Sequence, residues 1–213
     1  MKWPFFQKTF LPDEPFRIHM DNPSAVDLFS RHLRRLIGRG HDPARPIVIL
    51  CIGTDRSTGD SLGPLVGSRL KELDHPMIRV FGTLDQPVHA VNLEETLEVI
   101  RREYDQAYVI AVDACLGRTE SIGFINLKAG PLQPGTGVNK TLPEVGDLHI
   151  VGIVNVGGFM EYLVLQNTRL SVVMKMAEII SSALIPELAQ RFPALPAAHL
   201  SATAENSPEF QPF

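Results

Sequence analysis

Residues 47–64 read IVILCIGTDRSTGDSLGP, and this stretch decides the fold of the chain. Its first six residues are apolar with no polar alternation, which is typical of a strand buried on both faces of a sheet. A glycine-bounded polar loop follows and carries Asp55, Arg56 and Asp60. Open α/β sheets bind ligands outside the carboxyl ends of their strands, so this loop is the first candidate for a functional site.

The rest of the chain alternates strands with helices. Working outward, we expect strands at 46–52, 78–82, 107–113, 122–127 and 149–155, and helices at 24–40, 61–73, 92–104, 159–166 and 168–185. Ser24 and Asn92 stand where helix N-caps are expected, and Pro186 is expected to end or kink the last helix. This alternation predicts an α/β protein with a mainly parallel sheet between two helical layers, a three-layer α/β/α fold.

The 213 residues predict one domain. We expect an N-terminal arm at 1–22, an α/β/α domain at 23–190 and a flexible C-terminal tail at 191–213, because the two ends are rich in proline and lack a hydrophobic period. We expect residues 129–147 to form a long glycine- and proline-rich loop, and loops of this length without structure of their own are usually functional or mobile.

Composition narrows the class of protein. The formal charge of -4 offers no net attraction to nucleic acid or to an anionic membrane, and no run is long and apolar enough to cross a bilayer. Cys51 and Cys115 both follow apolar runs and are expected to be reduced core residues. The sequence therefore predicts a cytoplasmic protein without nucleic-acid or membrane partners, and it leaves homo-oligomerisation open.

Three carboxylates follow the ends of buried strands. Asp55 and Asp60 come after the first strand, and Asp113 ends the run of six apolar residues before it. If Asp60 and Asp113 face each other, they can share a proton as a general acid and base, or they can bind a divalent cation. The alternative for Asp60 is a plain helix N-cap. Asp113 is harder to explain structurally, because a buried carboxylate needs a partner or a ligand.

Other chemistries fit less well. The loop ends in Gly59-Asp60-Ser61, where a phosphate-binding loop requires a lysine, so it places negative charge where phosphate would bind. Ser57 and Thr58 have no evident base beside them in the sequence. His149 is expected to be structural, and the histidines show no metal-ligand spacing. Arg118 is expected to form a salt bridge or to orient a substrate carbonyl.

Three motifs in order also carry a family resemblance. They are Gly53-Thr54-Asp55 with Thr58-Gly59-Asp60-Ser61-Leu62-Gly63-Pro64, then Ile110-Ala111-Val112-Asp113-Ala114 with Arg118, then Pro134-Gly135-Thr136-Gly137-Val138-Asn139-Lys140. Over about residues 45–185 the chain resembles the YyaC-type sporulation proteins. That family is similar to the germination protease of bacterial spores and to the hydrogenase-maturation peptidases.

The resemblance implies a phosphorylase/hydrolase-like α/β/α fold and a peptidase site with Asp60 and Asp113 as its catalytic acidic pair. It further implies substrate binding by Asp55, Arg118 and the 133–140 loop, including Gly135, Gly137 and Asn139. The maturation peptidases hold a metal with two acidic residues and a histidine. No histidine stands in that third place here, and Glu144 is the nearest substitute. In a separate departure, Gln133 stands where the germination protease has histidine. We therefore expect no metal cofactor, with a divalent cation at the acidic pair left open.

Two functions remain at this point. The first is a sporulation-associated peptidase of the germination protease type, in which the acidic pair hydrolyses bonds in a protein or peptide substrate. The second is a catalytically silent protein of spore formation that binds a peptide or protein in the same crevice.

Overall fold

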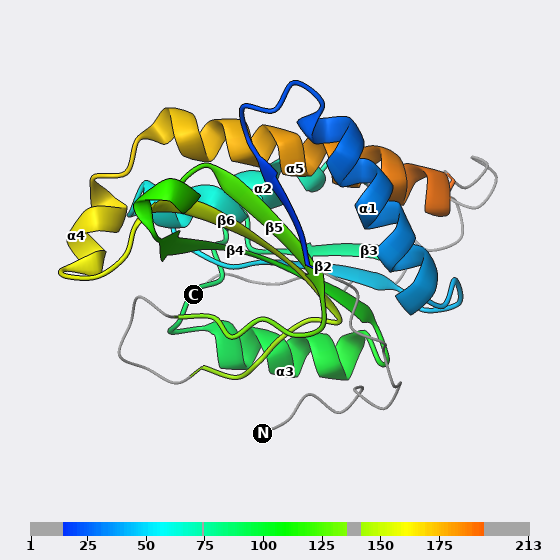
Figure 1. Cartoon of the computed structure of the whole chain (residues 1–213). Helices are drawn as coiled ribbons and strands as arrows, with labels where there is room; N and C mark the ends of the chain where they lie inside the picture. Colours follow the sequence, from blue (N-terminus) through cyan, green and yellow to red (C-terminus); the bar gives the residue numbers. More distant parts are fainter. Residues whose placement is uncertain (1–14, 74, 136–141, 194–213) are drawn as a thin grey trace.

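The computed structural model describes residues 15–73, 75–135 and 142–193. Its centre is a six-stranded sheet with the order β1-β5-β6-β4-β2-β3 (Figure 1). The strands are β1 (Phe16–His19), β2 (Ile47–Cys51), β3 (Ile78–Phe81), β4 (Tyr108–Gly117), β5 (Phe124–Ala129) and β6 (Leu148–Val156). The helices are α1 (Ala25–Gly40), α2 (Leu62–Leu70), α3 (Leu93–Glu103), α4 (Glu161–Gln166) and α5 (Leu170–Arg191).

The predicted three-layer α/β/α fold is confirmed. Helices α1, α2 and α5 cover one face of the sheet and α3 covers the other (Figure 1). Alternate residues of β2 supply the two cores: Ile47 and Ile49 pack with the first group of helices, whereas Val48 and Leu50 pack with α3. Because side chains alternate across a strand, an uninterrupted apolar run is what a strand with helices on both sides requires.

Strand directions make the sheet mixed. β3, β2, β4 and β6 are parallel neighbours, while β5 runs antiparallel to β6 and β1 runs antiparallel to β5. β1 lies inside the segment 1–22 that we expected to be an arm. No clear pattern in the sequence predicts this strand, because it is four residues long, lies at the sheet edge, and buries only Ile18.

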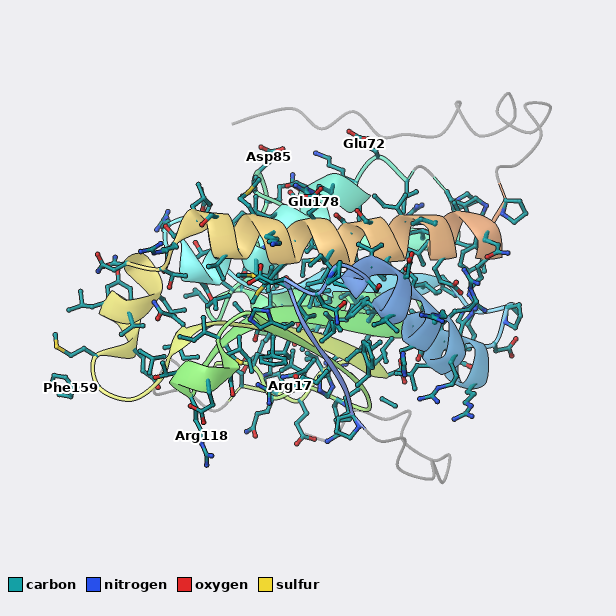
Figure 2. All side chains as sticks on the ribbon, turned by 45° about the horizontal axis from the view of Figure 1, so that its top comes forward. Arg17, Glu72, Asp85, Arg118, Phe159 and Glu178 are labelled. Atoms are coloured by element: carbon teal, nitrogen blue, oxygen red, sulfur yellow. The ribbon has the colours of Figure 1, made fainter. Side chains whose placement is uncertain are left out.

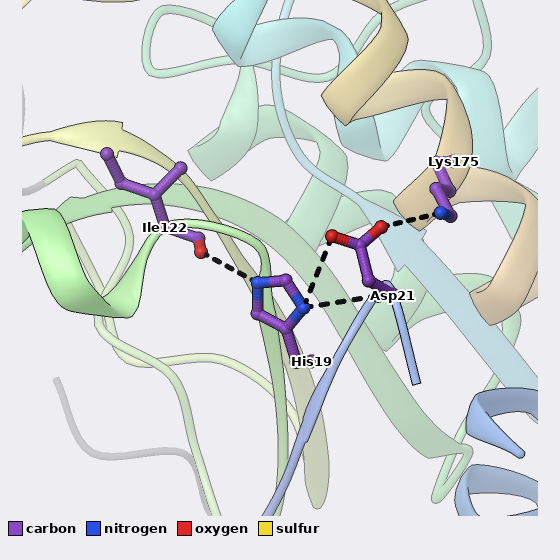
Figure 3. A network of polar contacts seen from close by, with 4 residues as sticks. All are labelled: His19, Asp21, Ile122 and Lys175. Atoms are coloured by element: carbon purple, nitrogen blue, oxygen red, sulfur yellow. Dashed lines mark hydrogen bonds and ion pairs between the residues drawn. The ribbon is translucent and has the colours of Figure 1, made fainter. Parts of the chain in front are cut away.

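A small polar network ties β1 to its surroundings (Figure 3). His19 Nε2 lies 3.2 Å from the carbonyl oxygen of Ile122, and the backbone N–H of Asp21 donates to His19 Nδ1 over 3.2 Å. The Asp21 carboxylate accepts from Lys175 Nζ of α5 at 2.6 Å. This hydrogen bond lowers the pKa of the exposed Asp21 carboxyl. The edge strand is thus fixed both to the turn before β5 and to a helix.

Several local expectations about helices need correction. Pro186 does not end α5, which continues to Arg191. The turn after the proline is held by the buried Glu187. Its carboxylate accepts from Arg34 of α1 and from Arg191 of α5 itself, each at 2.9 Å. Asn92 precedes α3 as expected, but its side chain makes no capping bond with the helix; its Oδ1 accepts from the N–H of His89 at 2.8 Å instead.

Within the described ranges, no helix combines the length and the apolar character that a bilayer span requires.

Candidate active site

A cavity of about 400 Å³ lies at the carboxyl ends of β2 and β4. Its apolar lining includes Ile52, Ala90, Val91, Ala114, Leu116, Leu142 and Leu165. Its polar lining includes Thr54, Arg56, Ser57, Asp60, His89, Asp113, Cys115, Glu161 and Tyr162. The two aspartates selected from the sequence as a catalytic pair therefore face one cavity.

Two glycines fold the loop after β2 so that Asp60 returns to the end of that strand. Gly53 has φ of +139°, and a Cβ built there would lie 1.9 Å from the Asp60 carbonyl oxygen. A Cβ on Gly63 would lie 2.1 Å from the Ile52 carbonyl oxygen. Neither position accepts a larger residue without a shift of backbone, so the glycines are needed for this close approach.

Asp60 is not a helix cap. It lies in a short 3-10 turn, Gly59–Ser61, that leads into α2. The residue directly before α2 is Ser61, and its Oγ donates to the Thr58 carbonyl oxygen at 2.7 Å rather than capping the helix. The N-cap alternative for Asp60 is therefore not supported, and the carboxylate is available to the cavity.

Asp113 lies within β4, and it lines the cavity. Its side chain is buried, with 7% of the residue exposed, and Oδ1 accepts from the backbone N–H of Ala114 at 2.8 Å. No cation pairs with it among the described residues. A carboxylate in this position is costly to ionise.

The electrostatics of the two aspartates differ from those of exposed carboxylates. Burial raises the pKa of Asp60 to about 6, while a backbone hydrogen bond from Thr54 acts in the opposite direction. Burial also raises the pKa of Asp113 well above its usual range, and the nearby Asp60 raises it further. Because Asp113 is the more deeply buried and also feels the charge of Asp60, its carboxyl is the harder of the two to ionise.

Of the other residues predicted for the site, some line the cavity and some do not. Gly135 lines the cavity, whereas Gly137 and Asn139 lie outside the described residues. Asp55 is exposed and does not line the cavity. The structure does not bring Arg118 to the cavity either: it lines a separate depression with Arg17 and points outward (Figure 2).

The two cysteines are both free, and they differ in position. Cys51 is fully buried below the site, while Cys115 lines the cavity. Burial and the neighbouring Asp113 raise the pKa of the Cys115 thiol to about 11. The thiol is protonated at neutral pH, so it is a poor nucleophile there. His149, expected to be structural, lies with Nδ1 at 2.8 Å from the Gly130 carbonyl oxygen, on a different part of the sheet.

Sequence reasoning missed His89, Glu161 and Tyr162 as cavity residues. His89 is brought there because Val88 forms an isolated bridge with Ile52 and accepts from the Gly53 N–H at 2.8 Å. No local pattern predicts this contact. A signal for Glu161 did exist, since a Gly-Gly turn directly after a predicted strand brings the following residues to the carboxyl end of the sheet.

Asp60 and Asp113 have no third clustered metal ligand within residues 15–73, 75–135 and 142–193. No three histidine, cysteine, aspartate or glutamate side chains in those ranges are grouped as metal ligands. Gln133 and Glu144 are exposed and do not line the cavity, so Glu144 does not replace a ligating histidine.

The three-layer α/β/α fold of this chain is also found in a solved protease structure. The crystal structure of a NiFe hydrogenase maturation protease, HycI from Thermococcus kodakarensis KOD1, superposes with a TM-score of 0.51. The match covers 74% of this chain and 98% of the protease at 19% sequence identity. At that identity the likeness extends to the fold alone.

The family is defined by sequence. Residues 17–183 match the family described as "Protein of unknown function (DUF1256)", and the chain belongs to it. It is 56% identical over 169 residues to "Uncharacterized protein YyaC" of Bacillus subtilis (strain 168), covering 78% of this chain and 80% of the relative. The resemblance to the YyaC-type family is thus confirmed.

Proposed function

We propose that this protein is a cytoplasmic, sporulation-associated peptidase of the germination protease type that hydrolyses peptide bonds with Asp60 and Asp113. The observation that carries the proposal is the pair itself: two carboxyls with raised pKa values face one cavity, and one lies close enough to shift the pKa of the other. Such perturbed pairs are enriched at catalytic sites.

The two carboxyls have different protonation states, and these define their roles. Ionised Asp60 accepts a proton from a water molecule, whose oxygen attacks the carbonyl carbon of the scissile peptide bond. Protonated Asp113 donates a hydrogen bond to the carbonyl oxygen and stabilises the negative charge of the tetrahedral intermediate. When the carbon–nitrogen bond breaks, Asp60 returns its proton to the leaving amine.

The ordered motifs support the finer parts of the proposal. The segments around Asp60, Asp113 and Gly135 resemble those of the germination protease, and all three segments reach the same cavity. The peptidase-like fold is compatible with such a reaction, although folds alone do not determine activity. The natural substrate would then be a spore protein or a peptide derived from one.

The test is hydrolysis of purified small acid-soluble spore proteins, with new termini identified by mass spectrometry. Wild-type protein should produce defined fragments, with and without a metal chelator, while Asp60→Asn and Asp113→Asn should not. Asp55→Asn is the matched control, because Asp55 is on the same loop but does not line the cavity. Equal cleavage by the folded Asp60→Asn variant would remove the mechanism.

The same experiment addresses the silent binding protein. In that case the wild-type protein would bind the spore proteins or their peptides, and mass spectrometry would find no new termini in them. The activity proposal would then fail while the cavity kept a role in recognition.

A further inference from the structure

The carboxyl end of β4 extends beyond its neighbour β2. Pairing between these two strands stops at Cys51 and Val112, whereas β4 continues to Gly117. On its other side β4 stays paired with β6 as far as Gly117 and Val156. Within the described ranges, no strand pairs with the β2 side of residues 113–117. These last residues of β4 therefore form a sheet edge inside the domain.

The direction of the backbone groups along this edge follows from the ladder. The Ile52 N–H donates to the Val112 carbonyl oxygen at 2.7 Å, so the polar groups of Val112 point toward β2. Backbone groups alternate sides along a strand, and those of Ala114 and Leu116 therefore point the same way. Cys115 pairs with Ile153 and Leu116 pairs with Asn155, so the register shift skips a residue of β6 and none of β4. The alternation of backbone groups along β4 is therefore retained. The Ala114 N–H is already bound by Asp113 Oδ1, but the Ala114 carbonyl and the Leu116 groups face the open side.

This open edge faces the active-site cavity. Ala114, Cys115 and Leu116 all line it and are only partly buried, and Asp113 directly precedes them. Across the cavity lie the Asp60 loop and α4. An extended peptide laid along this edge would continue the sheet where β2 ends and pass directly beside the acidic pair.

The lining of the cavity beside the edge is mixed and includes exposed apolar side chains. Tyr162 of α4 is 65% exposed and Val91 is 85% exposed, and both line the cavity. Phe159 extends the apolar surface outward, being 88% exposed (Figure 2). Large apolar side chains grouped beside a cavity are typical of binding sites for apolar partners.

Helix α4 buries none of its residues, yet it is firmly placed. A Cβ on Gly59 would lie 2.8 Å from Leu165 Cδ2, so α4 packs directly against the Asp60 loop. Glu161, the first residue of the helix, accepts at Oε1 from the N–H of Gly158 at 3.1 Å. Tyr162 is thus carried on a helix that packs against the Asp60 loop.

We propose that a substrate polypeptide binds in extended form by strand addition to the edge at residues 114–116, with apolar side chains against Tyr162. This inference rests on the proposed function and specifies its substrate class: an unfolded or extended apolar segment of another chain. Main-chain hydrogen bonds provide the affinity in such recognition, and pockets for alternate side chains provide the selectivity. Proline is excluded wherever the edge requires a substrate N–H.

The test measures binding separately from turnover. The full-length Asp60→Asn variant is titrated with a fluorescein-labelled peptide of alternating valine and threonine, followed by fluorescence anisotropy. Two further peptides are N-methylated either at every valine or at every threonine. Because N–H groups alternate sides along a strand, we expect one of the two to lose affinity at least tenfold, about 1.4 kcal/mol, and the other to bind nearly as the parent does.

Protein variants test the apolar side of the site. Tyr162→Ser should weaken binding of the parent peptide about tenfold. Leu163→Ser is the matched control, since Leu163 is exposed on the same helix but does not line the cavity. This substitution should leave the affinity for the parent peptide unchanged. Equal loss for the two variants, or equal effects of the two N-methylated peptides, would overturn the proposal.

A second copy of the chain is the competing occupant. Sedimentation equilibrium of wild-type protein and of Tyr162→Ser distinguishes it. A wild-type dimer that dissociates in Tyr162→Ser would overturn the proposal, because a second copy of the chain would then occupy the surface around α4. If peptide binding is observed without hydrolysis of any substrate, the proposed activity fails while the strand-addition site stands.

Discussion

The acidic pair and the network at the edge strand use the same residue type for opposite purposes. Asp60 and Asp113 form no ion pair with a cation in the described part of the chain, and burial raises the pKa of both carboxyls. Asp21 is exposed and receives a hydrogen bond from Lys175, which lowers its pKa (Figure 3). The environment, rather than the residue type, thus separates a carboxylate suited to chemistry from one suited to joining two elements.

The largest effect is expected from replacing the acid of the pair. Asp113→Asn keeps the shape and burial of the side chain but removes the carboxylic acid that donates to the substrate carbonyl. We expect hydrolysis to fall by roughly a thousandfold, within the range found for positioned acid–base groups. The measurement is kcat/KM on a cleaved spore-protein peptide. Asp21→Asn should leave the same quantity unchanged, and similar losses in both variants would remove the contrast between the regions.

The pH dependence of hydrolysis should follow the ionisation of Asp60. The base form is lost as pH falls through about 6, so kcat/KM should decrease about tenfold per pH unit well below that value. A second decrease is expected at higher pH when Asp113 loses its proton. These apparent values belong to the coupled pair.

His89 also lines the cavity, so His89→Gln is the control for this profile. The acidic limb should persist in the variant. Its disappearance would assign the limb to the histidine instead.

Stability should respond in the opposite direction to activity. The pKa of Asp60 in the folded state is raised to about 6. The contribution of this carboxyl to the free energy of unfolding is therefore fully present below its unfolded-state pKa. It is lost as the pH rises through about 6. Asp60→Asn removes the cost of the buried charge and should raise the free energy of unfolding at pH 7 by on the order of 2 kcal/mol.

Urea denaturation at two pH values checks this expectation. The gain should be present at pH 7 and nearly absent at pH 4, where Asp60 is protonated in the folded state. Asp55→Asn, on the exposed part of the loop, should show no comparable gain. A loss of stability at pH 7 in Asp60→Asn would mean that the carboxylate has stabilising contacts.

The smallest effect is expected at the edge strand. Asp21→Asn removes the charge that pairs with Lys175, but both groups are exposed to solvent and exposed ion pairs contribute little. We expect a slight decrease in the thermal midpoint that vanishes at high salt because of screening. Differential scanning calorimetry at low and high ionic strength measures it, and a large salt-independent decrease would show that the network holds β1 in place.

Particular residues show how far sequence reasoning extended. The apolar runs at 47–52 and 107–113 predicted two buried strands, and the carboxylates at their ends predicted that Asp60 and Asp113 share a crevice. The same reasoning also grouped Asp55 and Arg118 with the site, although neither lines the cavity. Position after a strand predicts the correct end of the sheet, but it does not predict the direction of a side chain on a loop.

The sequence by itself determined the three-layer fold, the parallel strands at its centre and the acidic pair, because uninterrupted apolar runs and strand-end carboxylates are local patterns. Only the tertiary structure decided the protonation order of the pair, since burial and mutual repulsion depend on neighbours distant in the chain. It also decided the open edge of β4, which exists because β2 ends several residues earlier than β4. Neither strand length nor the position of α4 beside Asp60 is a property of any single segment.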